Sequence, residues 1–363
     1  MSILTIAVIL TGVILLSLNL IIHLSLSELF SRENSMDVSV NISVVVAAKN
    51  ESRNIPLLTN SLNNQNYPKD SFEVIIVDDN SEDGSFELIK EKIKDIPDFR
   101  VVKALNKELP AKKGALTIGV SHAVNPFIVI TDADCAPKKD WLKACSAAFQ
   151  TGAGLIFGIA PFVVKSSLVN HVSCFENLRA AMLTFAAAGL NIPYSARGGN
   201  FGFSREAFDK LGGYKGTMDT VSGDDDLLIR EAVKNKIKIS VLTDAESFVY
   251  TNTPVNFKDY IKQKARHTST SNYYLFRHQF LLAVWHILNI VCMFSPALIF
   301  LSINILWLFA GKLIMDVTLL KLHQKKFGYK FGFSEMPGLQ LIFECFIIFN
   351  YLNAAIRSRT NWK

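Results

Sequence analysis

Two carboxylates separated by one residue, Asp132 and Asp134, follow directly on the apolar run Phe127–Ile130. Side chains two positions apart on an extended segment point to the same side, so both carboxylates can address one cation. Carboxylate oxygens are the ligands that Mg²⁺ and Mn²⁺ prefer. Such a cation can bridge the two phosphates of a nucleotide diphosphate. Although acid-x-acid patterns are often structural, the position after a buried run favours a metal site.

Three adjacent carboxylates, Asp224, Asp225 and Asp226, follow Gly223. Like charges disfavour each other's ionised form, so the chain either exposes all three or uses the repulsion to raise the proton affinity of one. A carboxylate tuned in this way can act as a general base, an effect of about 10²–10⁴ in rate. The alternative interpretation is that these acids begin a helix over Asp226–Lys234, where the helix dipole favours negative charge.

A second acidic pair, Asp78 and Asp79, ends the apolar run Phe72–Val77. A carboxylate at the end of a strand can accept hydrogen bonds from the base or ribose of a nucleotide, but the same residues also suit an ordinary turn. Lys112 and Lys113 precede a predicted helix, where charge and helix amides favour phosphate. Lysines at such positions are also common on solvated surfaces, so both interpretations stand.

The elements that must position these residues alternate between strands and helices. Short β-branched runs separated by helices predict a doubly wound α/β fold with a parallel sheet covered on both faces. Ligands bind beyond the carboxyl ends of the strands in such sheets, which is where both acidic pairs fall. The predicted strands are 42–47, 72–77, 100–104 and 127–131, and the predicted helices are 54–64, 85–93, 114–123, 171–190 and 226–234.

Apolar segments flank this alternating region. The chain has 363 residues, of which 50% are hydrophobic and 19% charged, a balance typical of a membrane protein. Ile3–Leu26 is long enough to cross a bilayer core of ~30 Å and lacks the basic start and cleavage site of a signal peptide, so it predicts an uncleaved anchor. Phe280–Leu320 and Pro337–Ile356 are further apolar stretches. Glu344 inside the last must face a partner helix or the membrane interface.

Charge and cysteine usage exclude other classes of protein. The net charge of +6 is modest and the basic residues are spread, so no nucleic-acid partner is expected. The five cysteines are odd in number and form no Cys-x-x-Cys pair, so we expect no disulfide or zinc framework.

Two basic stretches near the carboxyl end, Lys321–Lys330 and the tail residues Arg357 and Arg359, both favour the cytoplasm. A single crossing would separate them, so one apolar segment is predicted to be re-entrant or interfacial.

Taken together, the motifs resemble glycosyltransferase family 2 enzymes of GT-A fold, in the membrane-embedded branch with cellulose, chitin and hyaluronan synthases and ceramide glucosyltransferase. The resemblance covers roughly Asn41–Tyr274. It rests on the segment Ser43–Glu51, the acidic clusters, Gly198–Phe201 and Gln263–His267. It implies a Rossmann-like, mostly parallel sheet, a nucleotide-diphosphate sugar donor, a lipid or saccharide acceptor, and Mg²⁺ or Mn²⁺.

The resemblance also implies roles for single residues. Matching the acidic pair makes Asp225 the catalytic base, whereas matching the downstream Leu227 and Arg230 makes it Asp224; Asp225 is preferred. The family's Gln-x-x-Arg-Trp segment has His267 in place of Trp, which removes a broad stacking surface and weakens the case for a polymer channel. The implied donor-binding residues are Ala48, Asn50, Glu51, Asp78, Asp79, Lys113, Asp132, Asp134, Gln263, Arg266 and His267, and the acceptor-side residues are Gly199, Asn200 and Asp226.

We therefore expect an inverting glycosyltransferase that moves a sugar from a UDP-sugar to an acceptor in the membrane. The alternatives are a processive polysaccharide synthase, a catalytically silent membrane protein that binds nucleotide sugars, and a non-enzymatic channel or scaffold. The expected location is the inner (plasma) membrane. The expected domains are an anchor at 1–30, a cytoplasmic GT-A catalytic domain at 40–275, and a membrane region of two to three apolar segments at 279–356.

Overall fold

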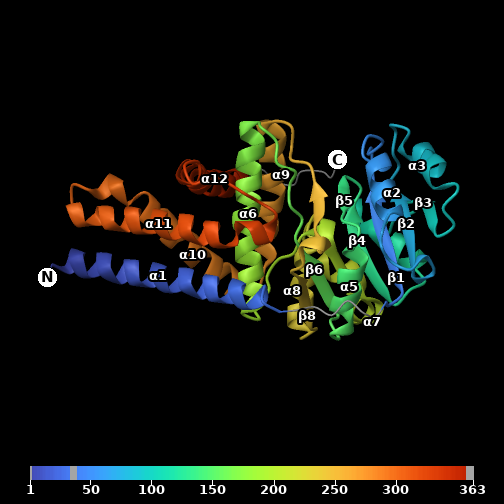
Figure 1. Ribbon diagram of the computed structural model, residues 1–363, viewed down its shortest axis with the longest axis horizontal. Helices are drawn as coiled ribbons and strands as arrows, with labels where there is room; N and C mark the ends of the chain where they lie inside the picture. Colours follow the sequence, from blue (N-terminus) through green and yellow to red (C-terminus); the bar gives the residue numbers. More distant parts are fainter. Residues whose placement is uncertain (1, 33–38, 357–363) are drawn as a thin grey trace. The chain divides into compact units, whose positions relative to one another are not determined.

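A computed structural model describes residues 2–32 and 39–356, and the chain divides into two compact units (Figure 1). The sheet unit contains the described residues 32, 39–163 and 193–253. The helical unit contains residues 2–31, 164–192 and 254–356. The expected domain boundaries stay a prediction, and the basic tail residues Arg357 and Arg359 lie outside the described residues.

In the sheet unit, seven described strands form one sheet in the order β3-β2-β1-β4-β7-β6-β8. The first four are parallel, as are β6 and β8, whereas β7 runs antiparallel to both of its neighbours. The predicted doubly wound, mostly parallel sheet is confirmed, and β7 is a reversal that the sequence pattern did not predict. The strands are β1 (Ile42–Ala48), β2 (Phe72–Asp78), β3 (Phe99–Lys103), β4 (Phe127–Asp132), β6 (Leu155–Gly158), β7 (Phe201–Ser204) and β8 (Ile239–Leu242), and a separate antiparallel pair consists of β5 (Cys135–Pro137) and β9 (Val249–Thr251).

Helices cover both faces of this sheet because its strands are apolar on both sides. Every residue of β1 and β2 is buried. Val44 of β1 belongs to one core cluster with Leu58 and Trp141, whereas its neighbour Val45 faces the opposite side, close to Gly119. The helices of this unit are α2 (Ile55–Asn63), α3 (Ser85–Ile93), α4 (Ala111–His122), α5 (Trp141–Gln150), α7 (Arg205–Lys210) and α8 (Asp226–Lys234).

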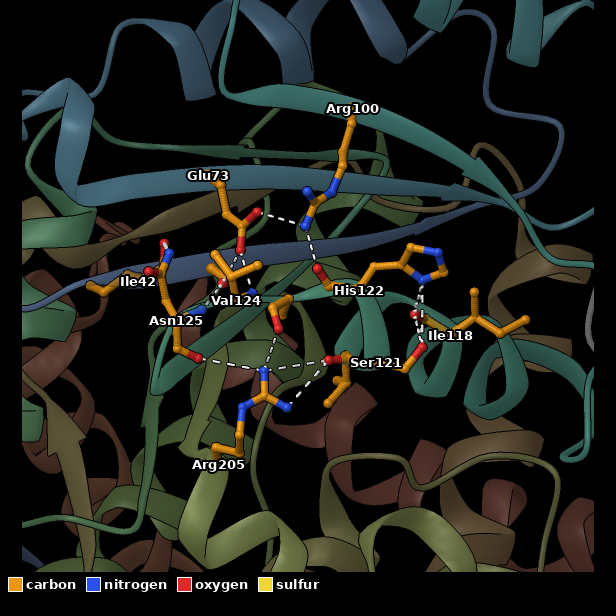
Figure 2. Close-up of polar contacts among 12 residues, drawn as sticks. Ile42, Glu73, Arg100, Ile118, Ser121, His122, Val124, Asn125 and Arg205 are labelled. Atoms are coloured by element: carbon orange, nitrogen blue, oxygen red, sulfur yellow. Dashed lines mark hydrogen bonds and ion pairs between the residues drawn. The ribbon is translucent and has the colours of Figure 1, made fainter.

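At the amino edge of the sheet, where β1 to β4 begin, polar side chains close a hydrogen-bonded network (Figure 2). The buried Glu73 carboxylate accepts from Ser43 Oγ at 2.5 Å and from Val124 N at 2.7 Å, and it pairs with Arg100 at 2.7 Å. Arg205 Nη2 donates to the carbonyl of Ala123 at 2.6 Å. These contacts fasten the loop before β4 to the starts of β1 and β2.

In the helical unit, three segments of the described chain are long and apolar enough to cross a membrane: Ile3–Leu29, Phe276–Met293 and Ile303–Phe327. Glu344 faces a partner helix as expected, because Lys312 Nζ lies 3.1 Å from its carboxylate. Both side chains are almost fully buried, so the pair holds two helices together. The helices are α1 (Ile3–Leu29), α6 (Leu168–Gly189), α9 (Phe257–Thr270), α10 (Phe276–Met293), α11 (Leu306–His323) and α12 (Met336–Ile356).

Candidate active site

The loops that follow β1 and β2 are tied together at the carboxyl edge of the sheet. Asn50 N donates to Ser81 Oγ at 2.9 Å, and Asn50 Oδ1 accepts from Glu82 N at 2.9 Å. Asn50 has a φ of 56°, a left-handed conformation that asparagine tolerates better than most residues. Glu51 N donates to Ser85 Oγ at 2.9 Å. The predicted donor loop therefore lies beside the loop that carries the first acidic pair.

Asp78 and Asp79 keep carboxylate oxygens unsatisfied although both residues are buried. Asp79 Oδ1 pairs with Lys107, and Asp79 N donates to the carbonyl of Ala48 at 2.7 Å. Within the part of the chain that the structure describes, Asp78 Oδ1 and Asp79 Oδ2 have no hydrogen-bond partner. Buried polar atoms are nearly always paired in folded proteins, so these two oxygens suit a ligand that donates hydrogen bonds.

Asp132 ends β4, and its carboxylate lies close to that of Asp134. One ligand atom each from Asp132, Asp134 and Cys135 lie within 4.8 Å of one another, which is close enough for a single ion. The residues present therefore fit a divalent metal. Burial raises the pKa of the Cys135 thiol, with the charges of Asp134 and Asp132 acting in the same direction. The two carboxylates, as hard oxygen ligands, match Mg²⁺ or Mn²⁺.

Lys112 joins this strand end to the second acidic cluster. Its ammonium lies 2.7 Å from Asp132 Oδ1 and 2.7 Å from Asp224 Oδ2. Burial opposes the charge on Lys112, but the two carboxylates outweigh it and hold the lysine pKa well above its ordinary value. Residues 92 positions apart in sequence therefore share one cation.

The pKa values of the two candidate bases, Asp224 and Asp225, are shifted in opposite directions. Burial disfavours the charged form of Asp224, yet the ion pair with Lys112 outweighs it, and the pKa of Asp224 is lowered. Burial raises the pKa of Asp225 well above its ordinary value, and the negative charges of Asp226 and Asp224 add to the effect. Asp225 is therefore the carboxylate with the higher proton affinity, which is what a general base needs.

Gly198 and Gly199 pack against these carboxylates. A methyl group placed on Gly198 would lie 3.3 Å from Asp225 Oδ2, 3.3 Å from Lys112 Nζ and 3.5 Å from Asp224 Oδ2. The equivalent group on Gly199 would lie 3.4 Å from Asp132 Oδ2. The Gly198–Gly199 turn thus marks the point where the two acidic clusters meet.

Other predicted site residues have local structural contacts. Lys113 Nζ donates to the carbonyls of Thr217 and Thr220, the latter at 2.9 Å. Asp226 accepts from Ser195 Oγ at 2.6 Å and from Ala196 N at 3.1 Å. Lys113 and Asp226 therefore fasten neighbouring loops, and their predicted donor and acceptor roles stay predictions.

Asn200 is fully buried and uses its whole amide group. Asn200 Oδ1 accepts from Trp141 Nε1 at 2.9 Å, and Nδ2 donates to the carbonyls of Ile159 at 3.0 Å and Ser247 at 2.9 Å. These bonds connect the start of β7 to three other segments of the sheet unit. The predicted position of Asn200 beside the acceptor stays a prediction.

The predicted residues Gln263, Arg266 and His267 lie on α9 of the helical unit. Gln263 Oε1 and Arg266 Nε are buried and have no hydrogen-bond partner among the described residues. The role of all three in donor binding stays a prediction.

Two side chains at the candidate site have contacts that the sequence did not predict. Lys112 was recognised as part of a basic pair, but nothing in the pattern Lys112-Lys113 shows which lysine reaches the carboxylates. Tyr214 is buried, and its hydroxyl has no hydrogen-bond partner within the described residues. Burial raises the Tyr214 pKa, and the charges of Asp224 and Asp225 raise it further. No sequence signal identifies Tyr214, because the sequence does not distinguish a core tyrosine beside a site from any other core tyrosine.

Comparisons with known proteins identify similar glycosyltransferases. The family described as Glycosyl transferase family 2 matches residues 43–212. The chain is similar to glycosyltransferase AglE of Haloferax volcanii, with 28% identity over 141 residues, which are 38% of this chain and 46% of that protein. The beta-monoglucosyldiacylglycerol synthase of Trichormus variabilis is 33% identical over 109 residues, which are 30% of this chain and 23% of that protein. The chain thus spans less than half the length of these two relatives.

A third relative matches over nearly its whole length. It is the dolichyl N-acetyl-alpha-D-glucosaminyl phosphate 3-beta-D-2,3-diacetamido-2,3-dideoxy-beta-D-glucuronosyltransferase of Methanococcus voltae, with 23% identity over 89% of this chain and 99% of that protein. Among solved structures, a mannosyltransferase from Pyrobaculum calidifontis in complex with GDP-Man and Mn²⁺ has a TM-score of 0.57 at 17% identity, over 95% of this chain and 98% of that one. This likeness confirms the GT-A fold.

Proposed function

Because the chain belongs to glycosyltransferase family 2, we propose that it is an inverting glycosyltransferase that moves a sugar from a nucleotide-diphosphate sugar to a membrane-associated acceptor. The observation that most supports this is the single ammonium of Lys112, 2.7 Å from both Asp132 and Asp224. This contact joins the end of β4, which carries the candidate metal ligands, to the two carboxylates that are candidate general bases. The cluster lies at the edge of the sheet where ligands of such folds bind.

On the donor side, the unsatisfied oxygens of Asp78 and Asp79 accept hydrogen bonds from the nucleoside. Asp132 and Asp134 hold Mg²⁺ or Mn²⁺, which when bound neutralises charge on the diphosphate leaving group. The donor is a UDP-sugar or a GDP-sugar. GDP-Man is included because the mannosyltransferase of the same fold is described in complex with it.

In the reaction, Asp225 accepts the proton of an acceptor hydroxyl. The hydroxyl oxygen bonds to the anomeric carbon from the face opposite the diphosphate, and the bond between that carbon and the diphosphate oxygen breaks with its electron pair leaving on the diphosphate. The raised pKa of Asp225 supports this role, because a general base works best when its pKa approaches the operating pH. Attack from the opposite face inverts the configuration at the anomeric carbon.

The acceptor carries a lipid. Three segments of the helical unit can span a membrane. The relative that matches over nearly its whole length is named for a dolichyl phosphate glycan, and another is named for a diacylglycerol glycolipid. We place the protein in the inner membrane with the sheet unit on the cytoplasmic side, where nucleotide sugars are made. Transfer of one sugar per acceptor distinguishes this proposal from a processive synthase.

The test uses the purified full-length protein with Mn²⁺, a panel of UDP- and GDP-sugars, and lipid acceptors of the dolichyl phosphate and diacylglycerol classes. Mass spectrometry is expected to show one added sugar and release of the nucleoside diphosphate. Asp225→Asn is expected to lose turnover, whereas Asp209→Asn, a matched change at an exposed residue of α7, keeps it. A ladder of products would indicate a processive synthase, and no transfer from any donor would refute the proposal.

A further inference from the structure

The ammonium of Lys112 occupies a hydrogen-bonding position on the same carboxylate that the proposed metal requires. Lys112 Nζ lies 2.7 Å from Asp132 Oδ1, and Asp132 is also a member of the candidate metal cluster with Asp134. The Lys112 side chain is only 15% exposed, so water screens its charge weakly. A divalent cation and this ammonium therefore repel each other when both lie at Asp132.

A second contact gives the ammonium another place to stay. Asp224 Oδ2 also lies 2.7 Å from Lys112 Nζ. Gly198 adds no side chain here, and a methyl group at that position would lie only 3.3 Å from the ammonium. Lys112 can therefore leave Asp132 without losing its remaining carboxylate partner.

Lys113 shows that this arrangement is specific to one of two adjacent lysines. Its ammonium donates to the backbone carbonyls of Thr217 and Thr220. Both lysines lie near the second acidic cluster, but of the two only Lys112 forms ion pairs with Asp132 and Asp224.

From this geometry we propose that Lys112 is a positioning residue that a divalent cation displaces from Asp132, turning its ammonium toward the diphosphate of the donor while Asp224 retains it. The inference rests on the proposed function and deepens it, because it makes cation binding and donor binding depend on each other through one side chain. The ligand that receives the displaced ammonium is the pyrophosphate group of a nucleotide.

The proposal requires two effects of opposite sign. Replacing Lys112 with a neutral residue removes a positive charge from Asp132, so Mn²⁺ binding without nucleotide should become tighter by about tenfold. The same change removes a phosphate contact, so UDP or GDP should bind about tenfold more weakly at saturating Mn²⁺. A lysine with a merely structural role would weaken both, and a lysine that only contacts donor would leave Mn²⁺ affinity unchanged.

The experiment measures Mn²⁺ affinity by electron paramagnetic resonance and nucleotide affinity by calorimetry, on full-length protein in nanodiscs. The variants are Lys112→Met, Lys112→Gln as a second neutral change should the first not fold, and Lys112→Arg, which keeps the charge and should stay near the wild type in Mn²⁺ affinity. Lys138→Met is the matched control, because Lys138 pairs with Glu246 at 3.1 Å and should alter neither affinity. Melting temperatures confirm that each variant is folded.

The outcomes separate this inference from the proposed function. Tighter Mn²⁺ and weaker nucleotide binding in the neutral variants support the inference. Unchanged or weaker Mn²⁺ binding in folded Lys112→Met or Lys112→Gln overturns it. The metal site still stands in that case if the wild type binds Mn²⁺ and the Asp132→Asn variant does not. If neither wild type nor neutral variants bind Mn²⁺, the metal site in the proposed function fails together with the inference.

Discussion

Both edges of the sheet carry buried carboxylates, but the two edges differ in whether the carboxylate oxygens have hydrogen-bond partners. At the amino edge the carboxylate of Glu73 accepts from Ser43 and Val124 and pairs with Arg100, so both of its oxygens are engaged (Figure 2). At the carboxyl edge, Asp78 Oδ1 and Asp79 Oδ2 are just as buried but have no hydrogen-bond partner among the described residues.

From this difference we expect the amino edge of the sheet to serve stability and the carboxyl edge to serve the proposed chemistry. A satisfied network stabilises the fold because every polar atom removed from water regains a partner. An unsatisfied carboxylate costs stability and persists where a ligand completes it. Replacements at the amino edge should therefore change the free energy of unfolding, and replacements at the carboxyl edge should change turnover.

The largest effect is expected at the candidate base. Asp225→Asn should lower the rate of sugar transfer by about 10²–10⁴ with little change in melting temperature, because the amide cannot accept the acceptor proton. Initial rates measured by mass spectrometry, beside Asp224→Asn, identify which carboxylate is the base. A larger loss in Asp224→Asn would reverse the assignment, and full activity in both would leave the carboxyl edge without its proposed base.

Next comes the amino edge. Glu73→Gln should lower the free energy of unfolding by about 1.5–3 kcal/mol, because hydrogen bonds to a buried charged group are lost. Transfer per folded molecule should stay at the wild-type rate. Glu91→Gln, in a solvent-exposed pair with Lys92, is the control and should change stability by less than about 0.5 kcal/mol. A loss of turnover in folded Glu73→Gln would contradict the division between the two edges.

Two glycines sharpen the same comparison. Gly198→Ala should reduce turnover by about tenfold with an unchanged melting temperature, because the new methyl group displaces the ends of Lys112 and Asp225. Gly202→Ala in β7 should destabilise the fold by about 1–3 kcal/mol, because its methyl group would lie 2.9 Å from the carbonyl oxygen of Ile128. Equal effects of both changes on stability would argue against this distinction.

The smallest effect concerns Lys113, whose pKa burial lowers from 10.5 to about 8. Between these two values the unfolded chain binds more protons than the folded one, so the free energy of unfolding should rise with pH, by about 1 kcal/mol from pH 7 to 9. Lys113→Met should abolish this rise. Melting curves across the pH range test it, and a rise that persists in the variant would assign it to another group.

The strand ends that carry the site could be predicted from sequence. Ile42–Ala48 and Phe72–Asp78 read as continuous apolar runs because strands of a parallel sheet are buried on both faces. The acids that end such runs must then lie at one edge. The first helix long and apolar enough to cross a membrane, Ile3–Leu29, could also be predicted, since a bilayer core demands about 20 apolar residues in succession.

The reversed strand β7 could not be predicted. Its four residues, Phe201–Ser204, are too short for a periodic pattern, and strand direction depends on partners distant in sequence. Asn200 shows the same limit: its hydrogen bonds join Trp141, Ile159 and Ser247, which are neighbours only after folding.

The amino-acid sequence alone determined that carboxylates end two buried strands and that apolar helices flank them, because both properties depend on local order along the chain. The tertiary structure alone decided that Lys112, and not Lys113, joins Asp132 to Asp224, and that the pKa of Asp225 is raised while that of Asp224 is lowered. The physical reason is that electrostatic interactions depend on distance through space and on burial, and neither can be read from spacing in the sequence.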